Sequence, residues 1–190
     1  MMLMLINLVG DNLNDKEIEV LKTQAKILLI YATETGSTAE VAAFIKKQIE
    51  DEKYEVVLSN VKEVDSVNNY DVIFVGSPIY VGRWKKEATE FIETNQEILK
   101  SKQVFYFLTC MNLTSNDPEK LAQVPKFLEN ERFLVEPLSE GRFAGAIDMK
   151  KLSFFKRMMV KMVKAPEGDF RNWEEIANWT KQSLKLIKDK

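Results

Sequence analysis

The residue types of a phosphate-binding loop occur together in one short segment, Thr33, Glu34, Thr35, Gly36, Ser37 and Thr38. These hydroxyls, and a glycine that admits a ligand close to the backbone, stand directly before residues 39–50, whose apolar side chains have helical spacing. The free N–H groups and positive dipole end of a helix N-terminus favour an anion. Because the loop lacks Lys and Arg, it differs from the P-loop that binds triphosphates and fits a single phosphate. An ordinary helix start with a capping box of Ser37 and Glu40 explains the same residues.

Two further loops follow apolar runs and have side chains that suit a flat ring system. The first contains Ser77, Pro78, Ile79, Tyr80, Val81, Gly82 and Trp84, and the second contains Thr109, Cys110, Met111, Asn112 and Leu113. Tyr80 and Trp84 could stack on a ring, although Trp84 could equally pack on the helix that follows. Backbone amides and the Asn112 side chain could bind the edge of a heterocycle. We interpret Cys110 as a small buried residue rather than a nucleophile.

The composition excludes the commonest forms of side-chain catalysis. The chain has no His, which rules out Ser-His-Asp and Cys-His catalysis, HExxH zinc sites and mixed Cys/His zinc fingers. Its single Cys cannot form an internal disulfide, which fits a reducing, cytoplasmic compartment. We therefore predict no metal site and no catalytic side chain, and we expect a bound cofactor to supply the chemistry.

Charge is nearly balanced over the whole chain but unevenly distributed. The 27 basic and 29 acidic residues give a net charge of −2, which does not indicate a nucleic-acid-binding protein. Residues 150–164 nevertheless contain six basic residues and no acidic one. Because the 190 residues include no apolar run of 18 or more, we expect one soluble domain at 26–190, preceded by an N-terminal extension at 1–25.

Alternating strands and helices must position the three loops. Apolar runs predict strands at 26–32, 54–58, 71–76 and 104–109, and a fifth from 133–135 together with 141–147. Apolar spacing predicts helices at 39–50, 87–99, 118–128 and 173–187. This alternation implies a parallel sheet covered by helices on both faces. Ligands of such sheets bind beyond the carboxyl ends of the strands, where all three loops lie.

The loops resemble those of flavodoxins. The segment from Thr33 to Thr38 resembles the flavodoxin loop that binds the phosphate of flavin mononucleotide (FMN), and Gly76-Ser77-Pro78-Ile79 with Gly82-Arg83-Trp84 resembles the second loop of flavodoxin-domain proteins. Further motifs occur in the order seen in the menaquinone-dependent protoporphyrinogen IX dehydrogenase family of long flavodoxin-like proteins. They are Asn112-Leu113, Pro118-Glu119-Lys120, Phe143-Ala144-Gly145-Ala146, a basic Met-rich helix and Asn172-Trp173-Glu174. The resemblance covers about residues 26–188.

This resemblance implies an α/β fold with a flavodoxin-like, doubly wound, five-stranded parallel sheet of order 2-1-3-4-5. A basic amphipathic helix would be inserted near the fifth strand, within about residues 148–171. The loop at 33–38 would bind the FMN phosphate, and the loops at 77–84 and 109–113 would hold the isoalloxazine ring. The chain has Tyr80 where the best-known members have an Arg, and only a short connection at 165–171. The resemblance therefore specifies the flavin site more closely than the substrate site.

The basic segment supports two interpretations. Its apolar face would consist of Leu152, Phe155, Met158, Met159, Met162 and Val163, and its positive charge comes from residues that include Lys156, Arg157, Lys161 and Lys164. The helix could lie on an anionic membrane surface, at the inner face of the cell membrane, and bring the flavin near a lipid-soluble quinone. It could equally be a surface helix whose apolar face packs on the sheet.

The main functional hypothesis is an FMN-dependent oxidoreductase. The resemblance implies oxidation of protoporphyrinogen IX, a step of haem biosynthesis, with a quinone as acceptor. One alternative is a flavodoxin that carries electrons between redox proteins, and another is a flavodoxin-like binding module with no redox role. The near-neutral charge and the basic segment favour the enzyme, because flavodoxin carriers tend to be shorter and strongly acidic.

Overall fold

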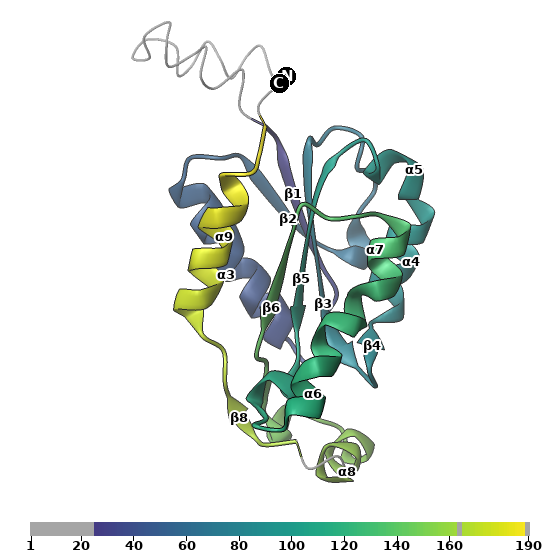
Figure 1. The fold of residues 1–190 in the computed structure, drawn as a ribbon, viewed down its shortest axis with the longest axis vertical. Coiled ribbons are helices and arrows are strands. Elements are labelled where there is room, and N and C mark those ends of the chain that lie inside the picture. The colour runs from purple at the N-terminus through teal and green to yellow at the C-terminus, as the bar shows by residue number, and fades with distance from the viewer. Residues whose placement is uncertain (1–24, 163–164, 189–190) are drawn as a thin grey trace, which may run out of the picture.

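A computed structural model describes residues 25–162 and 165–188. Its centre is a parallel sheet of β1 (Ile27–Tyr31), β2 (Val56–Asn60), β3 (Val72–Tyr80), β5 (Gln103–Thr109) and β6 (Ser139–Phe143). The strands lie in the order β2-β1-β3-β5-β6 (Figure 1). A short strand, β4 (Arg83–Trp84), pairs antiparallel with the end of β3. The predicted α/β fold with a parallel sheet of about five strands is confirmed.

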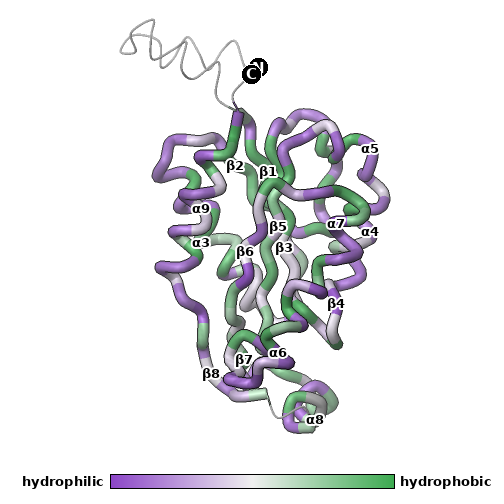
Figure 2. Tube along the Cα trace, viewed as in Figure 1, coloured by the Kyte–Doolittle hydropathy of each residue, from purple (hydrophilic) through white to green (hydrophobic). Residues whose placement is uncertain are grey.

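Helices cover both faces of this sheet (Figure 1). One face carries α3 (Ser37–Asp51) and α9 (Trp173–Leu184), and the other carries α4 (Lys86–Thr94), α5 (Gln96–Leu99) and α7 (Glu129–Leu134). Side chains alternate along β1, so that Leu28 and Ile30 join the core cluster under α4, while Ile27 and Leu29 join the cluster under α3. The strands therefore form a hydrophobic centre between helices with polar outer faces, as Figure 2 shows.

Two predicted helices are interrupted. The helix expected at 87–99 is divided at Asn95, whose side-chain amide donates to Phe91 O at 2.8 Å. The helix expected at 118–128 starts as predicted, with Asp117 as its N-cap, but only α6 (Pro118–Gln123) is α-helical. Its continuation is a 3-10 helix, Val124–Leu128, because Pro125 has no N–H to donate.

The fifth strand is β6, and the prediction that residues 133–135 belong to it is wrong. Residues 133 and 134 end α7, whose acidic first turn suits the positive end of a helix dipole. The actual strand lies at the sheet edge and carries Glu140 and Arg142, which form an ion pair of 2.7 Å. Edge strands tolerate charge, so no apolar run marks β6. Residues 146–147, also assigned to this strand, form β7 (Ala146–Ile147), which pairs antiparallel with β8 (Gly168–Asp169).

An insert between β7 and β8 lies beyond the carboxyl ends of the sheet strands (Figure 1). It contains a 3-10 turn, Met149–Lys151, and helix α8 (Phe154–Met162). Val163 and Lys164 of the basic segment lie outside the described residues, as do residues 1–24 of the expected N-terminal extension. Within the described ranges, no helix is both long enough and apolar enough to cross a bilayer.

Candidate functional site

The predicted phosphate loop connects the end of β1 to the start of α3. Gly36 is the N-cap residue and has a φ of +97°, a left-handed conformation that glycine adopts readily. Its N–H donates to the Thr33 hydroxyl at 3.0 Å, which closes the turn. A Cβ added at Gly36 would meet no atom within 4 Å. The loop is therefore open at the point where the helix begins.

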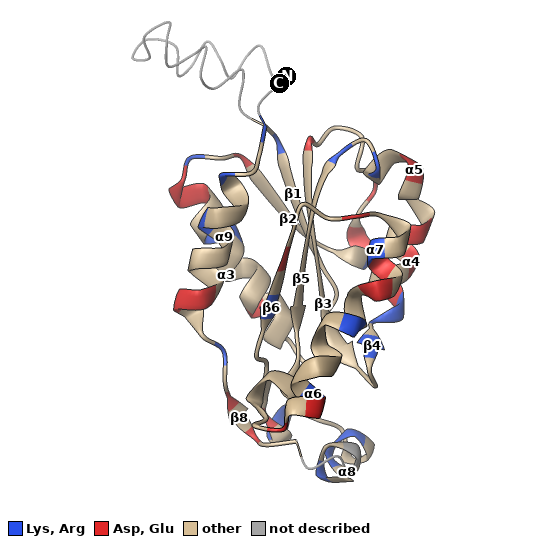
Figure 3. Ribbon diagram, in the orientation of Figure 1, with Lys and Arg blue, Asp and Glu red and all other residues tan. Residues whose placement is uncertain are grey.

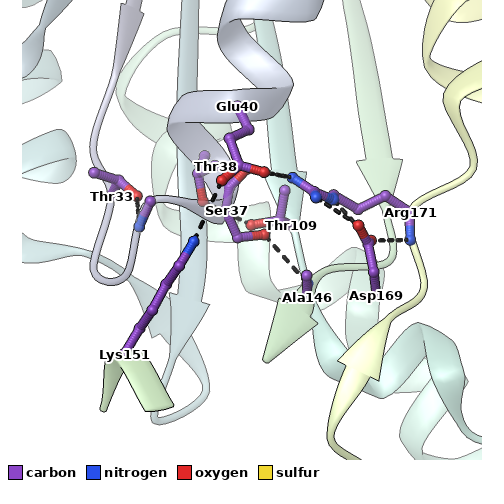
Figure 4. A network of polar contacts seen from close by, with 10 residues as sticks. Thr33, Ser37, Thr38, Glu40, Thr109, Ala146, Lys151, Asp169 and Arg171 are labelled. Atoms are coloured by element: carbon purple, nitrogen blue, oxygen red, sulfur yellow. Dashed lines mark hydrogen bonds and ion pairs between the residues drawn. The ribbon is translucent and has the colours of Figure 1, made fainter. Parts of the chain in front are cut away.

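The predicted capping box of Ser37 and Glu40 is wrong. Among the residues that the structure describes, no side chain caps the first amides of α3. Instead, Ser37 Oγ accepts from the Ala146 N–H at 3.2 Å, and Glu40 pairs with Arg171 at 2.7 Å (Figure 4). Both side chains bind segments more than 100 residues away in the sequence. Because the first N–H groups of a helix have no intrahelical partner, those of α3 are available to a ligand.

The first and third loops are joined by a pair of buried threonines. Thr38 Oγ1 and Thr109 Oγ1 lie 2.8 Å apart (Figure 4). Both side chains are buried, and this hydrogen bond holds the phosphate loop against the third loop. Thr33, Thr35 and Ser37 are partly exposed, and they supply the accessible hydroxyls of the phosphate loop.

The second loop is a tight hairpin between β3 and β4. Val81 and Gly82 form its turn, with φ values of +50° and +74°. Two-residue hairpins favour positive φ, but a β-branched side chain is strained in this conformation. Behind the turn, the fully buried Ser77 accepts from the Lys85 N–H at 2.9 Å, which fixes the start of α4 relative to β3.

The two aromatic residues of this loop have different environments. Trp84 is 2% exposed, and its ring packs edge-on against Tyr106 with 5.4 Å between centroids. The interpretation of Trp84 as a ring-stacking residue is therefore wrong, because the core encloses it, and its alternative role in packing is correct. Tyr80 is 39% exposed and remains accessible to a ligand.

The third loop forms a 3-10 turn, Met111–Thr114, directly after β5. Cys110 is buried, its N–H donates to Phe143 O at 2.9 Å, and burial raises the pKa of its thiol. These facts agree with a packing role for Cys110. The Asn112 side chain donates to Lys120 O at 3.3 Å and is thus turned toward α6. The other predicted residues of the second and third loops are partly buried beside these groups: Pro78, Ile79, Met111 and Leu113.

The structure adds a fourth segment that the sequence prediction did not include in the site, the strands β7 and β8 and the residues after them. The Arg171 guanidinium donates to Glu40, to the Ser37 carbonyl oxygen and to Asp169 (Figure 4). It also lies 4.6 Å from the centre of the Trp173 ring. A depression of about 350 Å³ lies beside the phosphate loop and is lined partly by this segment. The motifs at 143–146 and 172–174 flank this segment in the sequence, but no role in the site was predicted for them.

Glu34 connects the phosphate loop to lysines of two other segments. Its carboxylate accepts hydrogen bonds from Nζ of Lys85, at the start of α4, and from Nζ of Lys156 on α8. The hydrogen bonds from Lys156 and Lys85 lower the pKa of Glu34, so the carboxylate is ionised at neutral pH. Figure 3 shows the positive charge of α8 gathered at the same end of the sheet as this loop. No simple spacing in the sequence indicates this three-residue cluster.

Helix α8 exposes its large apolar side chains. Phe154, Phe155, Met158 and Met162 are each more than half exposed. The interpretation that the apolar face packs on the protein is therefore wrong for Phe155, Met158 and Met162, whereas Leu152, just before the helix, is buried. Arg157 turns back along the insert, and its Nε donates to Leu152 O at 3.0 Å.

Two curated proteins of known name are similar to the chain over most of its length. Protoporphyrinogen IX dehydrogenase (quinone) of Escherichia coli strain K12 is 23% identical over 177 residues, which cover 85% of this chain and 96% of that protein. The protein of the same name from Leishmania major is 25% identical over 158 residues, which cover 80% of this chain and 68% of that protein.

Solved structures of flavodoxins share the fold. Oxidised Flavodoxin 1 of Bacillus cereus has a TM-score of 0.58 at 16% identity and covers 86% of this chain and 100% of its own. Fusobacterium nucleatum flavodoxin bound to flavin mononucleotide has a TM-score of 0.56 at 16% identity, with 87% and 100% covered. The family model described as Flavodoxin domain matches residues 28–173, which is most of the chain. The chain therefore belongs to the flavodoxin domain family.

Proposed function

We propose that the protein is an FMN-dependent oxidoreductase. The observation that carries this proposal is the uncapped N-terminus of α3, which follows β1 with its first amides open to a ligand. The chain passes from β1 to β2 on one side and then to β3 on the other, so β1 and β3 flank the switch point where doubly wound sheets bind ligands. Membership of the flavodoxin domain family supports FMN as this ligand.

The donors of the phosphate loop fit a phosphate group. Thr33 Oγ1 accepts from the Gly36 N–H and Ser37 Oγ accepts from the Ala146 N–H. Each hydroxyl therefore keeps its own proton, which can be donated to a phosphate oxygen. The Thr35 hydroxyl and the first amides of α3 would complete the set. Hydrogen bonds of this kind to a charged acceptor are stronger than those between neutral groups.

The isoalloxazine ring would lie between the second and third loops. Tyr80 and the turn at 81–82 would contact it from one side, and the backbone at 109–113 from the other. A Cβ on Gly145 would come within 3.4 Å of Met111 Sδ, so the residues after β6 stand close to the third loop as well. Bound FMN would take electrons from a reduced substrate and pass them to an acceptor, and the protein's own residues would bind and orient it.

Protoporphyrinogen IX is the proposed reductant and a quinone the proposed acceptor. The names of the two curated relatives support this assignment. The exposed apolar and basic side chains of α8, which stand beside the candidate site, suit large apolar ring compounds. An electron carrier for protein partners is the second candidate, supported by solved flavodoxins that align over their full length.

We also propose that α8 lies on the anionic inner surface of the cell membrane. Its exposed aromatic and Met side chains would enter the lipid boundary, while Lys150, Lys151 and Lys161 would stay near the headgroups. Each Lys or Arg close to an anionic surface adds about 1 kcal/mol of attraction. This position would bring the flavin close to a membrane quinone.

Anaerobic assays of the FMN-loaded protein distinguish the candidates. We expect protoporphyrinogen to bleach the flavin absorbance and a menaquinone analogue to restore it. Reduction by protein donors alone, with no response to either small molecule, would favour the electron carrier. No response to any donor would favour a module without a redox role.

A further inference from the structure

The phosphate loop contains a carboxylate close to where an anion is to be bound. Glu34 stands between Thr33 and Thr35, whose hydroxyls belong to the proposed phosphate site, and its ionised side chain repels a phosphate group nearby. The loop has no Lys or Arg to offset this charge. Cations from other segments must therefore neutralise Glu34.

Two lysines do so, and they differ in how firmly they are held. The Lys85 side chain is mostly buried, and its Nζ also lies 3.8 Å from Glu87, on the same helix α4. Lys156 belongs to α8, which stands in the insert and exposes its apolar side chains. Lys85 is thus part of the sheet domain, whereas the contact of Lys156 depends on the position of α8.

We propose that Lys156 is a cofactor-affinity residue: its ion pair with Glu34 places an additional positive charge at the phosphate loop and so links the position of α8 to the strength of FMN binding. With Lys156 in place, Glu34 and the two lysines carry a net charge of +1, and without it they carry none. The proposal rests on FMN as the ligand of the loop. Because linkage is reciprocal, bound FMN also favours the position of α8 in which Lys156 contacts Glu34.

The electrostatics of the pair agree with this arrangement. The hydrogen bond from Lys156 is the largest cause of the lowered pKa of Glu34, and the hydrogen bond to Glu34 is the largest cause of the raised pKa of Lys156. A charge interaction with Tyr80 raises the pKa of Lys156 further. Lys156 is therefore also close to the second loop, where the ring of FMN would lie.

A double-mutant cycle of FMN affinity tests the link. Apoproteins of the wild type, Lys156→Gln, Glu34→Gln and the double variant are titrated with FMN at low salt, and the quenching of flavin fluorescence gives Kd. We expect Lys156→Gln to raise Kd about threefold to fivefold, the effect of one partly buried charge pair. In the Glu34→Gln background the same change should raise Kd less than about 1.5-fold, because the carboxylate that holds Lys156 at the loop is gone.

Lys86→Gln is the matched control. Lys86 adjoins Lys85 but forms its ion pair with Glu90, at 3.0 Å, so the variant removes the same charge without touching Glu34. Its Kd should equal that of the wild type. Circular dichroism checks that each variant is folded.

Hydrogen exchange of residues 154–162 gives an independent measurement. FMN should slow exchange in this segment of the wild type and leave it unchanged in Lys156→Gln. An equal rise of Kd in both backgrounds, no rise in either, or identical exchange with and without FMN overturns the link while FMN binding itself stands. A wild-type protein that does not bind FMN defeats the proposed function, and with it the link.

Discussion

Thr38 and Thr109 form a buried hydroxyl pair that fixes the start of α3 against the end of β5. Their Oγ1 atoms lie 2.8 Å apart although 71 positions separate the residues in the sequence. Thr38 stands in the first turn of the helix, and Thr109 is the last residue of the strand. A ligand that contacts both the phosphate loop and the third loop therefore depends on this pair for the geometry of its site.

Removing one hydroxyl of the pair should destabilise the fold. Thr109→Val leaves the Thr38 hydroxyl buried without a partner, which costs about 1–3 kcal/mol of unfolding free energy. Replacing both residues by Val should cost less than the sum of the two single changes, because no unpaired hydroxyl remains. Urea unfolding of the three variants measures this, and strictly additive losses would contradict the pairing.

Gly36→Ala should weaken FMN binding. The φ of +97° at this position disfavours alanine by about 1–2 kcal/mol, although a Cβ would meet no neighbouring atom. The turn can relieve this strain only by moving the first amides of α3. Gly36→Asn is the matched variant, since Asn tolerates left-handed conformations better than Ala. We expect the Kd of FMN to rise in the order Gly, Asn, Ala. An alanine variant with the wild-type Kd would argue against the proposed phosphate site.

The stability of the fold should depend on pH through Glu140. Burial alone would raise the pKa of Glu140, but hydrogen bonds and charges from Arg132 and Arg142 outweigh it and hold the pKa below its ordinary value of 4.5. A pKa that is lower in the folded chain stabilises the fold above the unfolded pKa. This contribution is lost as pH falls from about 4.5 through the folded value. Chemical unfolding at pH 7 and pH 3 should show a smaller loss in Glu140→Gln, and equal losses would exclude this role.

Membrane binding should require the exposed apolar side chains of α8. Phe154→Ser combined with Phe155→Ser should reduce co-sedimentation with vesicles that contain anionic lipid, and high salt should reduce it further. Phe133→Ser is a control, because Phe133 is also highly exposed but belongs to α7, outside the insert. Binding that survives the double change, or that Phe133→Ser lowers equally, would reject the docking of α8.

The elements and loops that local sequence determines were predictable. The apolar run of β1 predicts a strand, and the helical spacing of apolar residues in α3 predicts a helix. The phosphate loop is then the short segment that must connect them. Edge strand β6 was predicted only at residues 141–143, because its start carries charged side chains that form ion pairs and leave no apolar run. The α-helix expected through residue 128 becomes a 3-10 helix at Val124–Leu128, next to Pro125. The prediction followed the apolar spacing and did not take this proline into account.

Side-chain roles within the site were less predictable, because they depend on contacts distant in sequence. Ser37 and Glu40 have the spacing of a capping box, yet Ala146 and Arg171 bind them in the folded chain. The spacing of Trp84 within its loop does not reveal that its ring turns into the core beside Tyr106. Long-range contacts of this kind decide which hydroxyls and rings remain for a ligand.

Titration of the purified apoprotein with FMN, followed by its visible absorption spectrum and fluorescence, tests the central claim most directly. We predict saturable binding of one FMN per chain, with a shifted flavin absorbance and quenched fluorescence, and weaker binding in Gly36→Ala. An absence of flavin absorbance in the purified protein, together with no uptake of added FMN by a folded sample, would contradict the proposal that this chain is a flavin-dependent oxidoreductase.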